Sequence, residues 1–274
     1  MTIRPVEPHD REPRVALGLN RLHAVTREVS RAVGHCELTH LERWPIDVEL
    51  ARAQHRAYEE TLGRLGCEVH RLLEEPELPD SVFVEDVALV LDEVAVILRP
   101  GAASRRPETD SVARALAPHR RLAPLLGPGT VDGGDVVRVG RDLVVGRSSR
   151  SDAAGTAELA GVVRPYGYTV REAAVSGCLH LKSAVTAIGE GTLLIHRAWV
   201  DPTDLSDWRL IEVDPGEPYA ANALRVEETL VYPATAFPAT AEKLERHGYR
   251  LEPVDLSELA KAEGAVTCCS LVFT

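Results

Sequence analysis

The cysteines could act as nucleophiles or could be inert residues of the core. The five cysteines are scattered along the chain without a CxxC pair, which is typical of reduced thiols rather than of a disulfide framework. Cys268 lies in the segment AVTCCSLVF, whose small and β-branched residues suit a buried strand. Because side chains alternate between the faces of a strand, we expect Cys268 and Cys269 to point in opposite directions. One of them can then face a cavity as a nucleophile, although the common fate of a buried cysteine is inert core packing.

A histidine and several acids are the possible partners of such a thiol. His180 in GCLHLKSAVT has a leucine on each side, which in a strand would isolate the imidazole on its own face. Asp132 belongs to TVDGGDVV, a turn signal whose two glycines allow a ligand to approach closely. Glu85 and Asp86 in FVEDVALV, with Asp80 shortly before them, are costly to bury unless they meet a cation. A satisfied histidine, a plain turn and a solvated edge are the purely structural alternatives.

Four stretches predict β-hairpins, because in each of them apolar runs flank a polar turn. These hairpins are expected over residues 86–101, 134–147, 183–197 and 221–234. Helical periodicity and capping residues predict helices over 47–65, 110–116, 151–163, 239–247 and 255–262. A last strand over 265–273 has no hairpin partner after it, and the early segment 22–30 can supply one.

Equivalent positions of the five units carry residues with chemical potential. Just before or at the first strand of each unit stand Asp86, Asp132, His180, Asn222 and Cys268, at intervals of 42 to 48 residues. Repeats of this length are typical of ring-like architectures, in which equivalent positions converge on the central axis. The spacing therefore predicts a propeller-like α/β protein with these five side chains in one cavity. An open mixed α/β sheet is the alternative that periodicity leaves open.

Composition and charge limit the classes of function. The 274 residues are 45% hydrophobic and 27% charged, as in ordinary globular proteins, and we predict one domain over residues 1–274. Residues 1–20 are expected to form an irregular lead-in. The formal net charge of −11 argues against a nucleic-acid partner. Because we find no membrane-length apolar stretch and no secretory signal, we expect no membrane partner and a cytoplasmic location.

Six ordered segments carry a resemblance to a known family. They are LPDSVFVEDVALV, RPGAASRRPE, GTVDGGDVVRVG, LHLKS, YAAN and TCCSLVF. From about Val29 to Phe273 the chain resembles the dimethylarginine dimethylaminohydrolases, which belong to the guanidino-group-modifying (pentein) superfamily. The resemblance implies a five-bladed α/β propeller of ββαβ repeats, with the fifth blade closed by both chain ends. It also implies a hydrolase of linear amidine C–N bonds that converts N-omega-methylated L-arginine to L-citrulline and methylamine or dimethylamine.

The resemblance also implies roles for individual residues. Cys268, and not Cys269, matches the nucleophile, His180 matches the acid–base group, and Asp132 completes the catalytic set. The residues that match substrate contacts are Asp80, Glu85, Asp86, Arg99, Arg150, Val33 and Ala262. No cofactor or metal is expected, and zinc held by Cys268 and His180 would inhibit the enzyme. A methylarginine is the expected small-molecule partner, and the protein is expected to be a monomer or a homodimer.

Three alternatives remain open from the sequence. The chain can be a related enzyme that acts on free arginine or another guanidine, although paired Arg99 and Arg150 argue against agmatine, which has no carboxylate. It can be a non-catalytic homologue that binds methylarginine without turnover. A redox sensor built on Cys268 and Cys269 is the weakest alternative, because a vicinal disulfide is strained.

Overall fold

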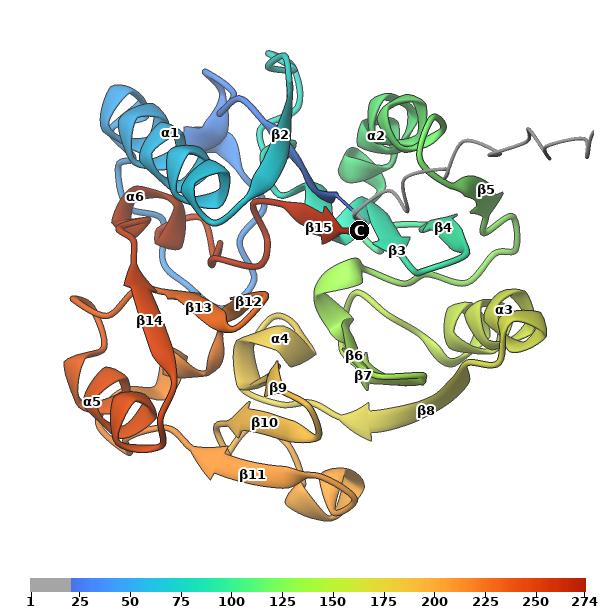
Figure 1. Cartoon of the computed structure of the whole chain (residues 1–274). Coiled ribbons are helices and arrows are strands. Elements are labelled where there is room, and N and C mark those ends of the chain that lie inside the picture. The colour runs from blue at the N-terminus through green and yellow to red at the C-terminus, as the bar shows by residue number, and fades with distance from the viewer. Residues whose placement is uncertain (1–20) are drawn as a thin grey trace, which may run out of the picture.

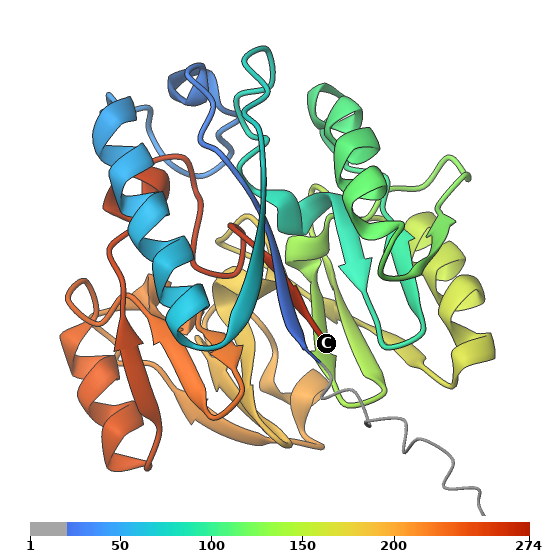
Figure 2. The same ribbon diagram turned by 45° about the horizontal axis from the view of Figure 1, so that its top comes forward.

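Five three-stranded sheets form the framework of the protein. The computed structural model describes residues 21–274, and the lead-in expected over residues 1–20 lies outside the described residues. The sheets are arranged around a common centre with helices on the periphery (Figure 1). Seen from an inclined direction, the long helices flank the sheets on the outside (Figure 2).

Four of the sheets, which we call blades I to IV, follow one chain path. An antiparallel hairpin is followed by a crossover and by a third strand parallel to the second. Blade I contains β3 (Ala88–Val90), β4 (Val94–Ile97) and β5 (Arg121–Pro124). Blade II contains β6 (Val136–Val139), β7 (Asp142–Arg147) and β8 (Thr169–Ala174). Blade III contains β9 (Val185–Gly189), β10 (Thr192–Ile195) and β11 (Arg209–Glu212), and blade IV contains β12 (Leu224–Val226), β13 (Thr229–Tyr232) and β14 (Arg250–Pro253).

Both ends of the described chain build the fifth sheet, blade V. Here β1 (Leu22–Arg27) pairs in parallel with β2 (Cys67–Leu72) and antiparallel with β15 (Leu271–Phe273). The strand β15 thus takes the place that the first hairpin strand has in the other blades. The prediction that the early segment supplies the partner of the last strand is confirmed.

The crossovers agree with most of the predicted helices. They are α1 (Val48–Arg64) in blade V, α2 (Thr109–Leu116) in blade I, α3 (Ala153–Val163) in blade II and α5 (Pro238–Arg246) in blade IV. Asp47 and Asp152 cap α1 and α3 by accepting hydrogen bonds from the backbone N–H groups of Leu50 and Gly155. In blade III the crossover holds only the short 3-10 helix η6 (Pro202–Leu205). Two further helices are short. The first, α4 (Leu181–Ala184), precedes β9, and the second, α6 (Ser257–Ala260), follows β14.

The hydrophobic core is divided into clusters that join neighbouring blades. Val25 of blade V packs with Ile97 of blade I, and the other three junctions up to blade IV are filled in the same way. The last cluster joins Val231 of blade IV to Ala24 of blade V. Every blade therefore buries apolar side chains against two neighbours, which is how a ring of small sheets becomes stable.

Two expectations about local structure are wrong. The last strand begins at Leu271, because residues 266–269 form a turn whose Cys268 N–H donates to the carbonyl of Ala265 rather than to another strand. His180 does not lie in a strand but directly precedes the helix α4. The argument from alternating strand faces therefore applies to neither Cys268 nor His180. No helix in the described part of the chain combines the length and apolarity needed to cross a bilayer.

Candidate active site

The five positions predicted from the repeat lie near the centre of the ring, but only Asp86, His180 and Cys268 line a common pocket, so the prediction of one cavity for all five side chains is wrong for Asp132 and Asn222. Each lies immediately before the first strand of its blade, in a turn or a short helical segment. Asp86 belongs to η2 (Val84–Val87), Asp132 precedes η4 (Gly133–Asp135), His180 precedes α4, Asn222 follows η7 (Pro218–Ala221), and Cys268 lies in the turn before β15. This shared placement explains why their intervals are so regular, since each blade brings the start of its first strand to the axis.

One pocket contains much of the predicted site. Among the predicted residues its walls include Asp80, Asp86, Arg150, His180, Ala262 and Cys268. The other wall residues are Glu37, Phe83, Arg105, Leu179, Glu263 and Gly264. Asp132, Glu85, Asn222, Arg99 and Val33 are not among them. The pocket is thus lined by a thiol, an imidazole, four carboxylates and two guanidinium groups.

His180 is held between two carboxylates. Its Nε2 lies 3.0 Å from Oδ2 of Asp132, and its Nδ1 lies 3.8 Å from Oδ1 of Asp86. Burial alone would lower the pKa of His180, but the charge of Asp86 and the hydrogen bond to Asp132 outweigh it and raise the pKa to about 9. At neutral pH this imidazole is therefore protonated and can donate a proton. Asp132 is fully buried and acts on the pocket through His180.

Asp135, for which the sequence predicted no role, positions the histidine. Its Oδ1 accepts a hydrogen bond from the backbone N–H of Leu181 at 2.9 Å, which fixes the start of α4 next to His180. Its Oδ2 accepts from the hydroxyls of Ser148 at 2.6 Å and Ser151 at 2.7 Å. Ser151 also accepts from the backbone N–H of Asp132 at 3.0 Å. The sign of Asp135 in the sequence is that TVDGGDVV contains a second acid. The groups that hydrogen-bond to this acid come from other segments, so the motif alone does not indicate its role.

The glycines of TVDGGDVV make room for the site's own side chains. A Cβ atom on Gly134 would lie 2.6 Å from Nδ1 of His180 and 2.8 Å from Oδ1 of Asp86. A Cβ atom on Gly133 would lie 1.9 Å from the carbonyl oxygen of Glu85. The expected close approach at these glycines is thus made by protein groups of the site.

Cys268 is the cysteine of the pair that reaches the pocket. It lines the pocket wall, whereas Cys269 is fully buried and its thiol lies 3.5 Å from the carbonyl oxygen of Ala265. The turn is anchored by Tyr58 of α1, whose hydroxyl donates to the carbonyl of Val266 at 2.8 Å. Burial raises the pKa of the Cys268 thiol far above its usual range, and Glu85 and Asp86 raise it further. Despite the cations of the pocket wall, Cys268 is therefore a thiol rather than a thiolate when no cationic substrate is bound.

Arg105, which the sequence analysis did not select, is a central cation of the site. Its guanidinium donates to Asp86, to Glu108 at 2.8 Å and to the carbonyl of Phe83 at 2.9 Å. Burial works against its charge, but Glu108 and Asp86 hold the pKa of Arg105 well above its usual value. Asp86 in turn has a lowered pKa, since the charges of His180 and Arg105 outweigh the effect of burial.

Arg99 lies outside the pocket and lines a different cavity, together with Pro100 and Arg106. The segment RPGAASRRPE offers three arginines, and the expectation that Arg99 reaches the substrate end of the pocket is corrected in favour of Arg105. The reason is local geometry, because the 3-10 helix η3 (Ala103–Glu108) turns Arg105 inward onto Asp86. The residue types of this segment do not indicate by themselves which of its arginines lines the pocket.

Glu85 and Asn222 anchor the turn that carries Cys268 through hydrogen bonds with Thr267. Glu85 pairs with Lys182 and accepts a hydrogen bond from the hydroxyl of Thr267 at 2.7 Å. The amide of Asn222 exchanges two hydrogen bonds with Thr267, at 3.0 and 3.1 Å. Burial raises the pKa of Glu85, and the contact with Lys182 opposes that effect. Both residues thus fix the residue before Cys268 and do not line the pocket.

Val33 is fully buried at the start of η1 (Val33–His35). Its carbonyl accepts a hydrogen bond from the N–H of Cys36 at 3.1 Å, and the residue does not line the pocket. Ala262 does line the pocket, as the resemblance implied.

Metal binding in the pocket has little support from these contacts. Among the described residues, Asp86, Asp132 and His180 bring ligand atoms within 4.8 Å of one another. Asp86 is already engaged by Arg105 and by the N–H of Gly134 at 3.0 Å, so a metal would compete with two existing partners. Cys268 is not part of this group, and the predicted inhibitory zinc stays a prediction.

Comparison with curated proteins finds relatives along almost the whole chain. The N(G),N(G)-dimethylarginine dimethylaminohydrolase of Streptomyces coelicolor is 42% identical over 252 residues, covering 90% of this chain and 95% of that protein. The protein of the same name from Pseudomonas aeruginosa is 34% identical over 257 residues, covering 92% and 99%. The chain belongs to the dimethylarginine dimethylaminohydrolase family. No protein-family profile matches it.

Solved structures of dimethylarginine dimethylaminohydrolases have the same fold. A cysteine-to-serine variant from Pseudomonas aeruginosa complexed with citrulline matches with a TM-score of 0.87 at 32% identity, over 93% of this chain and 99% of that one. A histidine-to-glycine variant that forms an adduct with S-methyl-L-thiocitrulline matches with the same TM-score of 0.87 and identity of 32%, over 93% of this chain and 100% of that one. The N-terminal domain of ArgZ, an arginine dihydrolase, shares the fold with a TM-score of 0.79 at 19% identity, over 93% of this chain and 98% of that one. The predicted five-bladed α/β fold is confirmed.

Proposed function

We propose that the protein hydrolyses N-omega-methylated L-arginine to L-citrulline and methylamine or dimethylamine. The observation that carries this proposal is a pocket that combines Cys268, a protonated His180 and the carboxylate of Asp86. A thiol, a proton donor and an anion are what hydrolysis of a guanidinium requires. Family membership and the citrulline held by the Pseudomonas aeruginosa relative support the same substrate class.

The charges of the pocket suit an α-amino acid that carries a guanidinium. Asp86 faces His180 and is the anion for the guanidinium, which offers a planar fork of N–H donors. Arg105 and Arg150 are the two cations of the wall and are suited to the α-carboxylate. Asp80 and Glu37 are the neighbouring acids, and the N–H of Glu37 donates to Asp80 at 3.1 Å. These two acids are suited to the α-ammonium side.

Binding of the substrate activates the nucleophile. In the protein without substrate, burial and the charges of Glu85 and Asp86 keep the Cys268 thiol protonated. A guanidinium next to the sulfur adds a positive charge, which lowers the thiol pKa and releases its proton to solvent. The pocket therefore generates its thiolate chiefly when a cationic substrate is present.

The reaction proceeds through a covalent intermediate. The Cys268 thiolate forms a bond to the guanidinium carbon, and the bond from that carbon to the methylated nitrogen breaks as the His180 imidazolium protonates the leaving amine. Neutral His180 then takes a proton from water, whose oxygen attacks the same carbon. Cleavage of the C–S bond releases citrulline and restores the thiol. Asp132 keeps the imidazole oriented throughout, through its 3.0 Å contact with Nε2.

We also propose that the protein is located in the cytoplasm. All five cysteines are buried free thiols, which suits a reducing compartment. The single-domain organisation and a state of monomer or homodimer are proposed with it.

The test is citrulline release from asymmetric dimethylarginine, monomethylarginine and arginine by the wild-type protein, Cys268→Ser and Cys269→Ala. We expect turnover of the methylated substrates, a loss of at least ~10³-fold in Cys268→Ser and near wild-type turnover in Cys269→Ala. Turnover of arginine alone would make the protein a deiminase. Tight binding of methylarginine without citrulline release would make it a binding protein, and equal losses in both cysteine variants would contradict the assigned nucleophile.

A further inference from the structure

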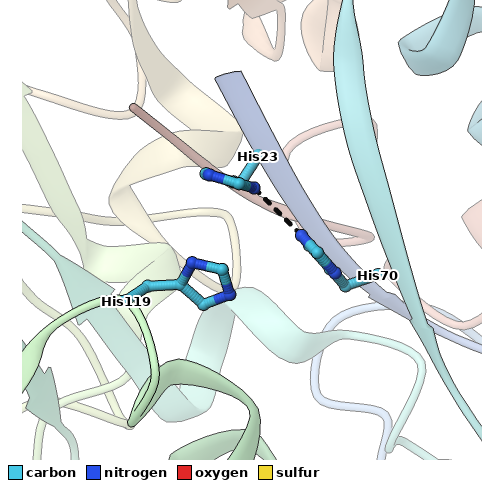
Figure 3. Close-up of side chains that lie close together, drawn as sticks. All are labelled: His23, His70 and His119. Carbon is cyan, nitrogen blue, oxygen red and sulfur yellow. Dashed lines mark hydrogen bonds between the residues drawn. The ribbon is translucent and has the colours of Figure 1, made fainter. Parts of the chain in front are cut away.

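Three histidines from separate elements meet on blade V, away from the pocket. His23 lies on β1, His70 on β2, and His119 in the turn after α2 (Figure 3). One ring nitrogen of each lies within 4.8 Å of the others, and all three side chains are half-buried. The Nδ1 of His23 lies 3.0 Å from Nε2 of His70.

We propose that His23, His70 and His119 bind a divalent transition-metal ion that prefers imidazole ligands, with Zn²⁺ as the reference ion. A tetrahedral zinc with Zn–N bonds of about 2.0–2.1 Å needs ligand nitrogens roughly 3.3 Å apart. The 3.0 Å distance between the nitrogens of His23 and His70 is close to that value, and the nitrogen of His119 lies within 4.8 Å of both. Three protein ligands leave the fourth position to water, which the half-buried rings allow.

The backbone holds the ligands in place before any metal arrives. In the parallel pair of β1 and β2, His70 is opposite Val25, two residues from His23, so the two imidazoles share one face of the sheet. The turn with His119 is fixed by its N–H, which donates to the carbonyl of Leu116 at 2.9 Å. Preorganised ligands lower the entropy that metal binding must overcome.

Simple ring packing explains the cluster less well. His119 packs edge-on against Phe273, with ring centroids 5.4 Å apart, but such packing does not require three nitrogens to converge. Among the described residues, the His119 ring makes no hydrogen bond that would use its nitrogens. Burial, and then the neighbouring imidazoles, lower the pKa of His23 and of His119, so both are available as neutral ligands.

The consequence of binding is a bridge between blades. His23 and His70 belong to blade V and His119 to blade I, so an ion would tie the blade that closes the ring to its neighbour. The cluster is also separate from the catalytic turn. His23 pairs with Phe273 at the end of β15, whereas Cys268 precedes the beginning of that strand. Metal at this place should stabilise the fold and leave turnover unchanged.

The test measures Zn²⁺ binding and the melting temperature of chelator-treated full-length protein. We expect one equivalent to bind at the cluster and to raise Tm by about 5 °C at saturation. In His70→Gln and in His119→Gln the affinity should fall by at least about tenfold and the Tm shift should vanish. His247 is exposed, so His247→Gln is the matched control. This variant should keep the Zn²⁺ affinity and the Tm shift of the wild type.

A Cys268→Ser variant separates this site from zinc bound in the pocket, and it should retain the Tm shift. Co²⁺ in place of Zn²⁺ gives an absorption spectrum that reports nitrogen ligands and changes only when a cluster histidine is replaced. His119 lies in a turn rather than a strand, so His119→Gln keeps the test valid if His70→Gln does not fold. Equal binding and equal Tm shifts in the wild type and both histidine variants would overturn the proposal, as would a shift that disappears only in Cys268→Ser.

Discussion

His180 lies between Asp86 and Asp132, whose charges favour its protonated form, and this has a consequence for stability. Its pKa is about 9 in the folded protein against an ordinary value of 6.5. The stabilisation from the bound proton is therefore complete below about pH 6.5 and is lost as the pH rises through about 9. We expect the free energy of unfolding to fall more steeply over this range in the wild type than in His180→Gln. Urea unfolding at several pH values measures this free energy. The same pH dependence in both proteins would contradict the raised pKa of His180.

Two of the three arginines in the segment RPGAASRRPE, Arg99 and Arg105, allow a matched comparison. Arg105→Ala leaves Asp86 and Glu108 buried without their cation, which typically costs ~3–5 kcal/mol. Arg99→Ala removes a side chain outside the pocket and should leave KM close to that of the wild type. We expect Arg105→Ala to lower the midpoint of chemical unfolding and to raise KM for methylarginine. Equal KM effects in both variants would return Arg99 to the binding site.

Short elements, rather than whole strands, place the reacting groups. Cys268 lies in the turn of residues 266–269, and Asp132 and His180 directly precede the short helices η4 and α4, while β-strands supply the frame. Such elements depend on tertiary partners. Tyr58, for example, reaches from α1 to the carbonyl of Val266 and to the hydroxyl of Ser270.

A glycine pair tests how tightly η4 is fitted. Gly134→Ala adds a Cβ atom 2.6 Å from Nδ1 of His180 and 2.8 Å from Oδ1 of Asp86, so these side chains or the backbone of η4 must shift. Gly161→Ala lies on the exposed face of α3 with nothing within 4 Å and should stabilise the protein by about 0.5–1 kcal/mol. We expect Gly134→Ala to lose most citrulline release and Gly161→Ala to retain it. Full activity in Gly134→Ala would show that the contact around His180 is looser than described.

At the scale of the whole molecule, the shared clusters couple the blades. Val144 packs between blades II and III, and Val25 packs between blades V and I. Because neither blade at a junction can bury its apolar face alone, we expect a single cooperative unfolding transition. Val144→Ala and Val25→Ala should each lower its midpoint, with losses of about 2 kcal/mol. Far-UV circular dichroism and tryptophan fluorescence should give coincident curves. Two separate transitions would mean that the chain contains more than one cooperative domain.

Much of the frame was predictable because hairpins and helices depend on local patterns. The alternation around the four hairpin turns and the caps at Asp47 and Asp152 act within a few residues of sequence. The interval of 42 to 48 residues between Asp86, Asp132, His180 and their equivalents predicted that these residues converge. Convergence followed from repetition alone, since similar units in a ring bring equivalent positions to the axis.

The amino-acid sequence by itself determined the repeat, the hairpins, the resemblance to the family and the types of residue available for chemistry. Periodicity did not distinguish Cys268 from Cys269, and it was the resemblance to the family that selected Cys268. Only the tertiary structure decided that Arg105 replaces Arg99 in the pocket wall and that Asn222 contacts Thr267 outside the pocket. The physical reason is the range of the interactions. Propensity and periodicity act over one turn or one strand, whereas the direction of a side chain depends on partners from other blades. The 3.0 Å contact of His180 with Asp132 joins residues 48 positions apart, and no local pattern contains it.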